Sequence, residues 1–176
     1  MRRANASKGR PKNHGVGRKR LKQKPIRALR LPRNAPEIDL TIRFVGSRGD
    51  GIGSASYTVG HETKAWPFYV PGSLEGEQVR VKPQQLTGQG LTAELVELLT
   101  PNPNRSAPVC DVFAGLKGCG GCSLQHMSES AYRNWKLDQL KRIFEKAGFG
   151  KDKLMAPPFA PPIWTQMSGR RRVRLS

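Results

Sequence analysis

Five short segments with strand-like patterns follow one another between residues 39 and 99, and a turn signal separates each from the next. They alternate apolar with polar residues or are rich in β-branched and aromatic residues, which is typical of half-buried strands. The segments lie at 39–45, 54–59, 64–70, 77–83 and 90–99. Glycine and proline mark the turns, at Gly46 through Gly53, Gly60, Pro71-Gly72, Gly76 and Gly88. This punctuation predicts a small OB-like β-barrel over residues 37–100 and a mainly β chain. The last segment also fits a helical period, but we interpret it as a strand.

Charge is distributed very unevenly along the 176 residues. The chain has 31 Lys and Arg against 13 Asp and Glu, a net charge of +18. Residues 1–36 hold 13 of the basic residues and no acidic one. This arm is rich in proline and poor in large apolar residues, so we expect it to be disordered. It is a phosphate-binding arm, a solubilising tail or the result of an over-extended start codon, and a mitochondrial transit peptide is a weaker alternative because serine is scarce.

The composition also excludes some classes of protein. No run of 18 apolar residues exists, which excludes a transmembrane helix, and no apolar stretch follows the basic N-terminus as a secretory signal requires. The strong positive charge indicates a polyanionic partner, most often nucleic acid. We expect no membrane partner, a cytoplasmic location and a monomer.

Basic and aromatic residues in the barrel segment are the candidate RNA contacts. The basic candidates are Arg43, Arg48, Lys64, Arg80 and Lys82. Tyr57, Trp66, Phe68 and Tyr69 supply rings that could stack on bases. Core packing is the simpler explanation for those rings, because Trp66 and Phe68 are two residues apart and therefore share one face of a strand.

A proline-containing linker and a cluster of three cysteines occupy 101–127. Cys110, Cys119 and Cys122 have the spacing C-x8-C-x2-C, and His126 follows four residues later. Thiolates at this spacing suit zinc or an iron–sulfur cluster. His126 could complete a Cys3His zinc site, whereas a 4Fe–4S cluster needs a fourth ligand and the chain has only three cysteines. The spacing alone leaves both metals open.

A helix is predicted over 128–148, followed at 149–176 by a proline-rich connector. Ser128 or Ser130 is the expected N-cap, and Gly148 fits the position just past the C-terminus. The apolar stripe consists of Tyr132, Trp135, Leu140, Ile143, Phe144 and Ala147. The lysines and arginines of this helix are expected mainly on a solvated face. The final residues RRVRLS alternate like the start of a strand, which we interpret as a truncation.

The barrel followed by CDVFAGLKGCGGCSLQH, the helix and SGRRRVRLS resembles the N-terminal part of the RNA uridine-C5-methyltransferase family. The resemblance covers residues 37–176, and its most specific part is the CGGC-x-x-Q-H signature. It implies a TRAM domain at 37–100, an RNA substrate (ribosomal rather than transfer RNA) and dependence on S-adenosylmethionine. It also implies a 4Fe–4S cluster on Cys110, Cys119 and Cys122. One departure is the gap between Cys110 and Cys119, which is three residues longer than the family pattern.

Two functions follow as hypotheses. The first is the RNA-binding and iron–sulfur portion of a uridine-C5 methyltransferase. We expect the 176-residue chain to be inactive alone, because no catalytic residue and no S-adenosylmethionine-binding segment is recognisable in it. The second is an RNA-binding module with a Cys3His zinc site and no enzymatic activity.

Overall fold

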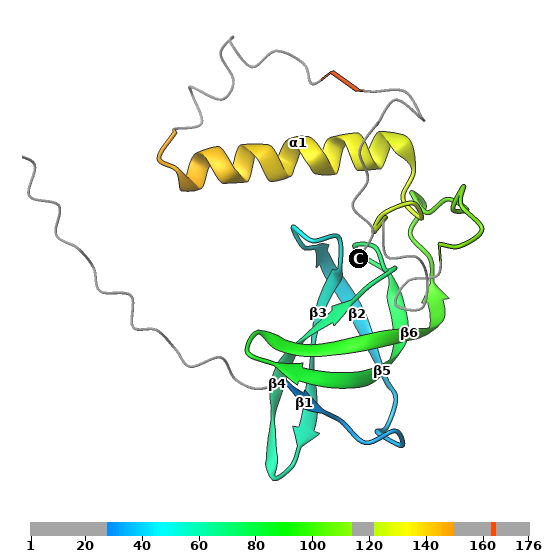
Figure 1. Ribbon diagram of the computed structural model, residues 1–176, viewed down its shortest axis with the longest axis vertical. Coiled ribbons are helices and arrows are strands. Elements are labelled where there is room, and N and C mark those ends of the chain that lie inside the picture. The colour runs from blue at the N-terminus through cyan, green and yellow to red at the C-terminus, as the bar shows by residue number, and fades with distance from the viewer. Residues whose placement is uncertain (1–27, 114–121, 150–162, 165–176) are drawn as a thin grey trace, which may run out of the picture.

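The computed structural model describes residues 28–113, 122–149 and 163–164. Five strands form a small barrel: β2 (Ile38–Val45), β3 (Gly51–Val59), β4 (Glu62–Val70), β5 (Gln78–Thr87) and β6 (Gly90–Thr100). The β4–β6 pairing is parallel, the other pairings are antiparallel, and the β5–β6 pairing closes the sheet on itself (Figure 1). The predicted mainly β fold with an OB-like barrel and one helix is confirmed. The segment that also fitted a helical period is strand β6.

The barrel interior is filled by apolar side chains from all five strands. The buried members are Leu40, Ile42, Tyr57, Phe68, Val70, Val79, Val81, Leu91 and Ala93. The rings of Tyr57 and Phe68 pack edge to face with their centroids 5.9 Å apart. Trp66 packs against the same cluster from a partly buried position. Three of the four rings considered for base stacking therefore belong to the core. This agrees with core packing, which was the simpler explanation for these rings in the sequence.

Two glycines that look like turn residues in the sequence lie inside strand β3. A Cβ on Gly51 would lie 2.1 Å from the Ser73 hydroxyl oxygen, and one on Gly53 would lie 2.3 Å from a Leu40 methyl carbon. Only a residue without a side chain fits where the backbone approaches its neighbours this closely. The turn between β2 and β3 is therefore shorter than the predicted cluster that runs from Gly46 to Gly53.

The basic arm was predicted to extend to residue 36, and that boundary is too late. Strand β1 (Leu29–Arg30) pairs with β5, and the backbone N–H of Leu31 donates to the carbonyl of Gln84 at 2.9 Å. Leu31 packs against the core and Ala35 is buried. These few apolar residues suffice to order 28–36 because they extend a sheet that already exists. Residues 1–27 lie outside the described part of the chain.

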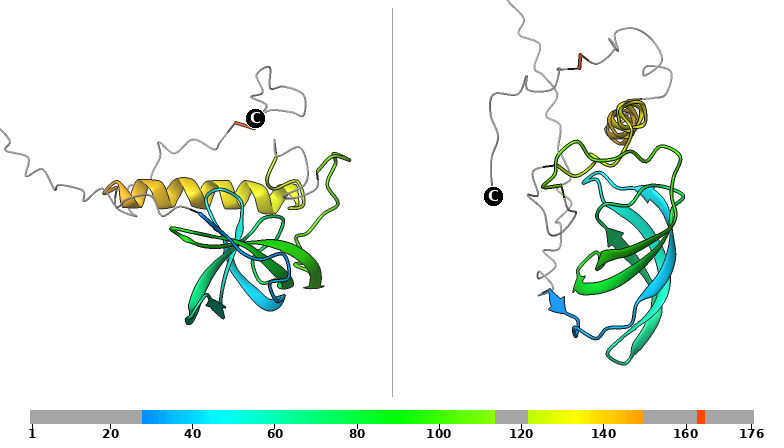
Figure 2. Two further views of the ribbon diagram at one scale, coloured as in Figure 1. Left: turned by 60° about the horizontal axis from the view of Figure 1, so that its bottom comes forward. Right: turned by 90° about the vertical axis from the view of Figure 1, so that its right-hand side faces the viewer.

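Helix α1 (Glu129–Lys146) lies across one end of the barrel (Figure 2). Ser128 caps its N-terminus as predicted, and Gly148 has the positive φ of 91° expected after its C-terminus. Tyr132 and Trp135 pack on a small cluster of Val45, Leu74 and Leu124, whereas Ile143 of the predicted stripe is 62% exposed. The helix is thus docked through its first half. None of the described helices is long and apolar enough to cross a membrane.

Candidate nucleic-acid interface

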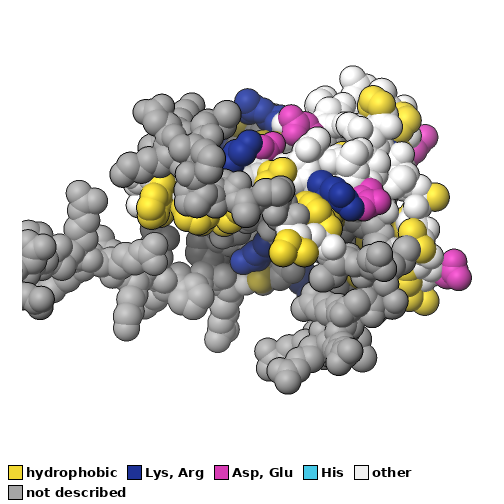
Figure 3. Space-filling view, turned by 90° about the horizontal axis from the view of Figure 1, so that it is seen from above, with side chains coloured by type: hydrophobic (Ala, Val, Ile, Leu, Met, Phe, Trp, Pro, Cys, Tyr) yellow, Lys and Arg dark blue, Asp and Glu magenta, His cyan; other side chains and the backbone are white. Residues whose placement is uncertain are grey.

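An open groove of about 1070 Å³ runs between the barrel and the second half of α1. It is lined by the end of β2 and the β2–β3 turn, the start of β3, the end of β4, the β5–β6 turn with the start of β6, and one side of the helix. Seen from the helix side of the molecule, Lys and Arg side chains lie among hydrophobic ones (Figure 3).

A row of side chains crosses the strands that form the wall of this groove. Phe44 of β2 is paired with Ile52 of β3, Ile52 with Tyr69 of β4, and Tyr69 with Thr92 of β6. All four residues line the groove. Directly paired residues on adjacent strands point to the same side of a sheet, so the row forms one continuous surface with two aromatic rings.

Phe44 reaches the outside of the barrel because β2 contains a bulge. The pairing steps from Ile42 opposite Gly53 to Phe44 opposite Ile52, so two residues of β2 oppose one of β3. The bulge reverses the alternation of the strand. Val45 is therefore buried at 4% exposure, whereas Phe44 is 42% exposed.

The groove carries three cations, Arg48 from the β2–β3 turn and Arg142 and Lys146 from α1. None of them forms an ion pair with a carboxylate in the described ranges. Among the described residues that line the groove, Asp50 is the only acidic one. Burial raises the pKa of Asp50, and the nearby charge of Arg48 acts in the opposite direction. The groove therefore offers a positive, partly aromatic surface, the combination that binds single-stranded nucleic acid.

The structure separates the five predicted basic contacts into distinct settings. Only Arg48 lines the groove. Arg80 is held on the outer surface between two carboxylates, with Asp39 at 2.8 Å and Glu97 at 2.7 Å. Lys64 pairs with Glu62 at 2.7 Å and lies 4.0 Å from the centre of the Trp66 ring. Arg43 is exposed on β2, and Lys82 lies opposite Glu94 in the β5–β6 ladder.

Sequence reasoning missed Phe44, Arg142 and Lys146 as groove residues. Simple alternation along 39–45 places Phe44 on the core face with Leu40 and Ile42, and only the bulge moves it outward. The two helix cations were assigned to a solvated face. Their spacing of four residues on one side of the helix is the one signal in the sequence that joins them.

Two of the three predicted metal-ligating cysteines lie in the described residues. Cys110 is half-buried, its backbone N–H donates to the side-chain oxygen of Gln125 at 3.1 Å, and Cys122 is exposed. Both thiols are free, and Cys119 lies outside the described residues. Free thiols on either side of a Gly-rich loop are a donor set that fits a soft metal centre.

His126, the fourth ligand of the zinc alternative, is buried rather than turned toward solvent. It is 2% exposed, its ring stacks on Phe113 with centroids 5.6 Å apart, and neither ring nitrogen has a hydrogen-bond partner among the described residues. Burial lowers the pKa of His126; the charge of Arg105 acts in the same direction and that of Glu77 in the opposite direction. Cys110, Cys122 and His126 do not form a group of three potential metal ligands within the described part of the chain.

Comparison with known proteins gives a consistent set of relatives, although no protein-family model matches the chain. An uncharacterized RNA methyltransferase of Caulobacter vibrioides is 37% identical over 137 residues, which are 78% of this chain and 28% of that protein. One from Parasynechococcus marenigrum is 36% identical over 69% of this chain and 24% of its own length. The 23S rRNA (uracil(1939)-C(5))-methyltransferase RlmD of Aeromonas salmonicida is 31% identical over 77% of this chain and 28% of its own length.

The matched share of this chain is large enough to include most of the described barrel. The chain spans about a quarter of the length of these curated relatives. The sequence similarity shows that this chain is a homologue of proteins named RNA methyltransferases, one of which is a 23S rRNA uracil-C5 enzyme.

Proposed function

We propose that this chain is the RNA-binding portion of an RNA uracil-C5 methyltransferase, and that the groove between the barrel and α1 holds single-stranded RNA. One observation carries the proposal. The exposed ring of Phe44 lines the groove together with the other residues of the row that crosses the strands. The same groove contains three cations that form no ion pair within the described residues.

The position of the groove on the barrel supports this proposal. In OB folds, the face of the second and third strands and the loops joining strands 1–2 and 4–5 bind oligonucleotides. In this barrel those parts correspond to β3, β4, the turn after β2 and the turn after β5, and all four contribute to the groove. The fold thus presents its cations and rings where OB folds bind nucleic acid.

The proposed substrate is ribosomal RNA, because one named relative modifies uracil in 23S rRNA. The proposed methyl donor is S-adenosylmethionine, by family resemblance. We place methyl transfer itself outside the barrel and α1, since none of the described residues that line the groove carries a thiol that could attack a pyrimidine. The role of the described residues is to bind and orient the RNA.

We further propose that Cys110, Cys119 and Cys122 hold a 4Fe–4S cluster, with zinc as the alternative metal. Such a cluster supplies a rigid thiolate-bound centre and a redox-active group. The residues of this chain hold the loop that would carry it. The hydrogen bond from Cys110 to Gln125 and the packing of Phe113 on His126 join the segment before the loop to the segment after it. The segment after the loop leads into α1.

The test of RNA binding compares two double variants of α1 that lose the same charge. Arg142→Gln with Lys146→Gln removes two groove cations. Arg133→Gln with Lys141→Gln removes two cations that pair with Glu129 and Asp138 on the same helix and do not line the groove. Binding of a labelled single-stranded RNA is measured by fluorescence anisotropy at several salt concentrations.

The groove variant should weaken binding. It should also reduce the magnitude of the slope of log affinity against log salt by about 1.4, because each of the two lost phosphate contacts contributes ~0.7. The control variant should leave the slope close to that of the unchanged chain. Equal effects of the two variants would mean that RNA responds only to the overall charge, and the groove proposal would then be wrong.

A further inference from the structure

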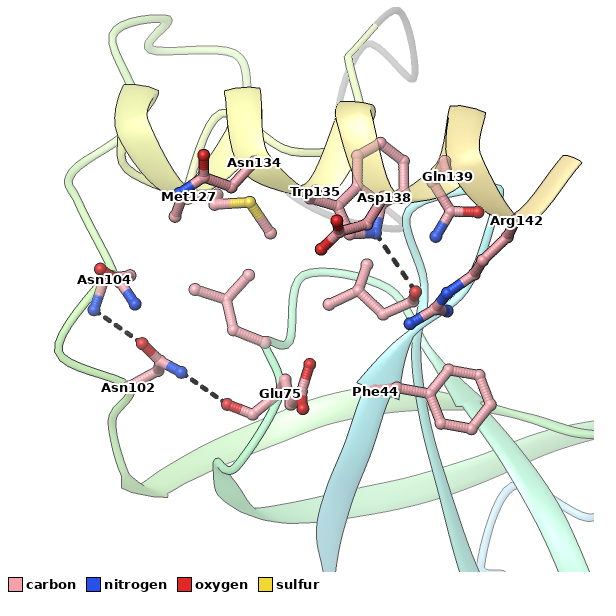
Figure 4. A pocket seen from close by; sticks show the side chains of 13 residues that line it. Phe44, Glu75, Asn102, Asn104, Met127, Asn134, Trp135, Asp138, Gln139 and Arg142 are labelled. Atoms are coloured by element: carbon pink, nitrogen blue, oxygen red, sulfur yellow. Dashed lines mark hydrogen bonds between the residues drawn. The ribbon is translucent and has the colours of Figure 1, made fainter. Parts of the chain in front are cut away.

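A second, smaller pocket of about 400 Å³ lies beside the groove, between α1 and the linker that follows β6. Figure 4 shows amide side chains on both of its sides, Asn134 and Gln139 on the helix and Asn102 and Asn104 on the linker. Trp135 and Asp138 lie between them on the helix. Its volume is at the small end of the range for sites that enclose a small molecule.

Three of the four amides are free to bind a ligand. Asn102 is engaged, because its side-chain N–H donates to the carbonyl of Glu75 at 2.6 Å and its side-chain oxygen accepts from the backbone N–H of Asn104 at 2.6 Å. The side chains of Asn104, Asn134 and Gln139 make no hydrogen bond to the rest of the described structure. Each therefore has two N–H donors and one oxygen acceptor available for a ligand.

A flat aromatic wall accompanies these amides. The indole N–H of Trp135 donates to the carbonyl of Val45 at 3.2 Å, which fixes the ring against the end of β2. Phe44 lines the pocket and, as noted above, is exposed on the outside of the barrel. A fixed indole and an exposed phenyl ring next to free amides are suited to a planar heterocycle, which stacks on a ring and hydrogen-bonds through its edge.

The pocket opens onto the groove. Phe44, Gln139 and Arg142 line both of them, so a strand that lies in the groove passes the entrance of the pocket. Glu75 and Asp138 also line the pocket, where Arg142 is the one cation among the described lining residues, and Asp138 in addition pairs with Lys141 at 3.9 Å. The two carboxylates outnumber that cation and disfavour a phosphate inside the pocket. The same carboxylates accept hydrogen bonds from an exocyclic amino group. The charges thus favour a base in the pocket and the backbone in the groove.

We propose that this pocket binds one unstacked adenine base of the RNA strand held in the groove, an inference that rests on the proposed function. A single side-chain amide reads adenine at two points, accepting from its amino group and donating to the adjacent ring nitrogen. Uracil offers two carbonyl oxygens at its pairing edge, and these face the carboxylates unfavourably. The groove is tolerant of sequence because it stacks bases and binds phosphates, whereas the pocket adds a preference for one base.

The test uses labelled single-stranded RNA of about ten nucleotides, the size that one OB fold covers. One oligonucleotide is all uridine, and three others carry a single central adenine, guanine or cytosine. Anisotropy titrations measure their affinities for the full 176-residue chain. The adenine oligonucleotide should bind about tenfold more tightly than all-uridine, as one bidentate base contact provides.

The variant Asn104→Ala with Asn134→Ala removes two pocket amides that do not line the groove. It should reduce the adenine preference to less than about twofold and leave both the affinity for all-uridine RNA and the salt slope unchanged. Gln89→Ala is the matched control, because this exposed amide lines only the groove and should keep the preference.

The outcomes separate the two proposals. Salt-dependent RNA binding without a base preference, a preference for another base, or a preference that survives in the double alanine variant would overturn the adenine pocket and leave the groove standing. Failure of every oligonucleotide to bind, or binding insensitive to Arg142→Gln with Lys146→Gln, would overturn the proposed function and the pocket together.

Discussion

Arg105 of the linker after β6 binds both carboxylate oxygens of Glu77 at the start of β5, each at 2.7 Å. The Glu77 carboxylate is fully buried and also accepts from the backbone N–H groups of Leu74 at 2.7 Å and Asn102 at 3.1 Å. The same arginine donates to the carbonyl of Gly72 at 2.8 Å. One ion pair thus joins the barrel to the linker that positions the cysteine segment and α1.

Removing Arg105 should therefore destabilise the protein strongly. Arg105→Ala leaves a buried carboxylate without its counter-charge, and breaking a buried pair in this way costs about 3–5 kcal/mol of unfolding free energy. Urea denaturation followed by tryptophan fluorescence measures the loss. The matched control is Arg80→Ala, because Arg80 also binds two carboxylates but on the exposed surface. A similar loss in both variants would contradict a special role for the buried pair.

The same network should make stability depend on pH in the acid range. Burial acts to raise the pKa of Glu77, but the hydrogen bonds from Arg105, Leu74 and Asn102 and the charge of Arg105 outweigh it, so the pKa lies below the ordinary 4.5. As the pH falls through 4.5, the carboxyl group of Glu77 is therefore protonated in the unfolded chain before it is protonated in the folded protein. The contribution of Glu77 is complete above that pH and is lost below it.

Glu77→Gln should make the unfolding free energy depend less on pH in this acid range. Its unfolding free energy should fall less between pH 6 and pH 3 than that of the unchanged chain, measured by urea denaturation at each pH. Glu62→Gln is the control, because Glu62 forms only an exposed pair with Lys64. If Glu62→Gln flattens the curve as much as Glu77→Gln does, the buried carboxylate is not the group responsible.

The strands were predictable from the sequence because alternation and turn residues are local signals. Three features were not, because each depends on residues far apart in the chain. Gly51 and Gly53 read as turn residues, yet their function is to let Ser73 and Leu40 approach the backbone. The bulge that exposes Phe44 depends on how β2 pairs with β3. The groove exists only because α1 docks against the barrel through Tyr132 and Trp135.

Residues 1–27 should supply much of the electrostatic part of RNA binding, because they hold eleven of the chain's Lys and Arg residues. If the whole chain neutralises ~5 phosphates of single-stranded RNA, the log–log salt slope should be near ~−3.5. Deleting 1–27 should flatten that slope markedly without changing the unfolding free energy. Deleting 1–36 should in addition lower stability, because it removes β1 and the buried Ala35. An unchanged slope after the shorter deletion would exclude the arm as a phosphate binder.

Cys119→Ser tests whether the three cysteines share one metal centre. Loss of one thiolate should lower the iron and sulfide bound after anaerobic reconstitution and weaken the visible absorption of thiolate-bound iron. Zinc in place of iron would support the alternative metal at the same ligands. His126→Asn is the informative companion, since a 4Fe–4S cluster on the cysteines should survive it and a Cys3His zinc site should not. Metal content unchanged by Cys119→Ser would show that the cysteines do not converge.

The 176-residue chain alone should transfer no methyl group to RNA. Carbon 5 of uracil is a poor nucleophile, so its methylation normally begins with addition of a thiolate at carbon 6 and ends with removal of the carbon 5 proton by a base. The chain has three cysteines, and all three are expected to bind metal, which occupies their lone pairs. Incubation with labelled S-adenosylmethionine and RNA lacking 5-methyluridine should give no label above that of a heat-inactivated sample. Label in the RNA would mean that one of Cys110, Cys119 and Cys122 is a nucleophile rather than a metal ligand, and the variant that abolishes labelling would identify it.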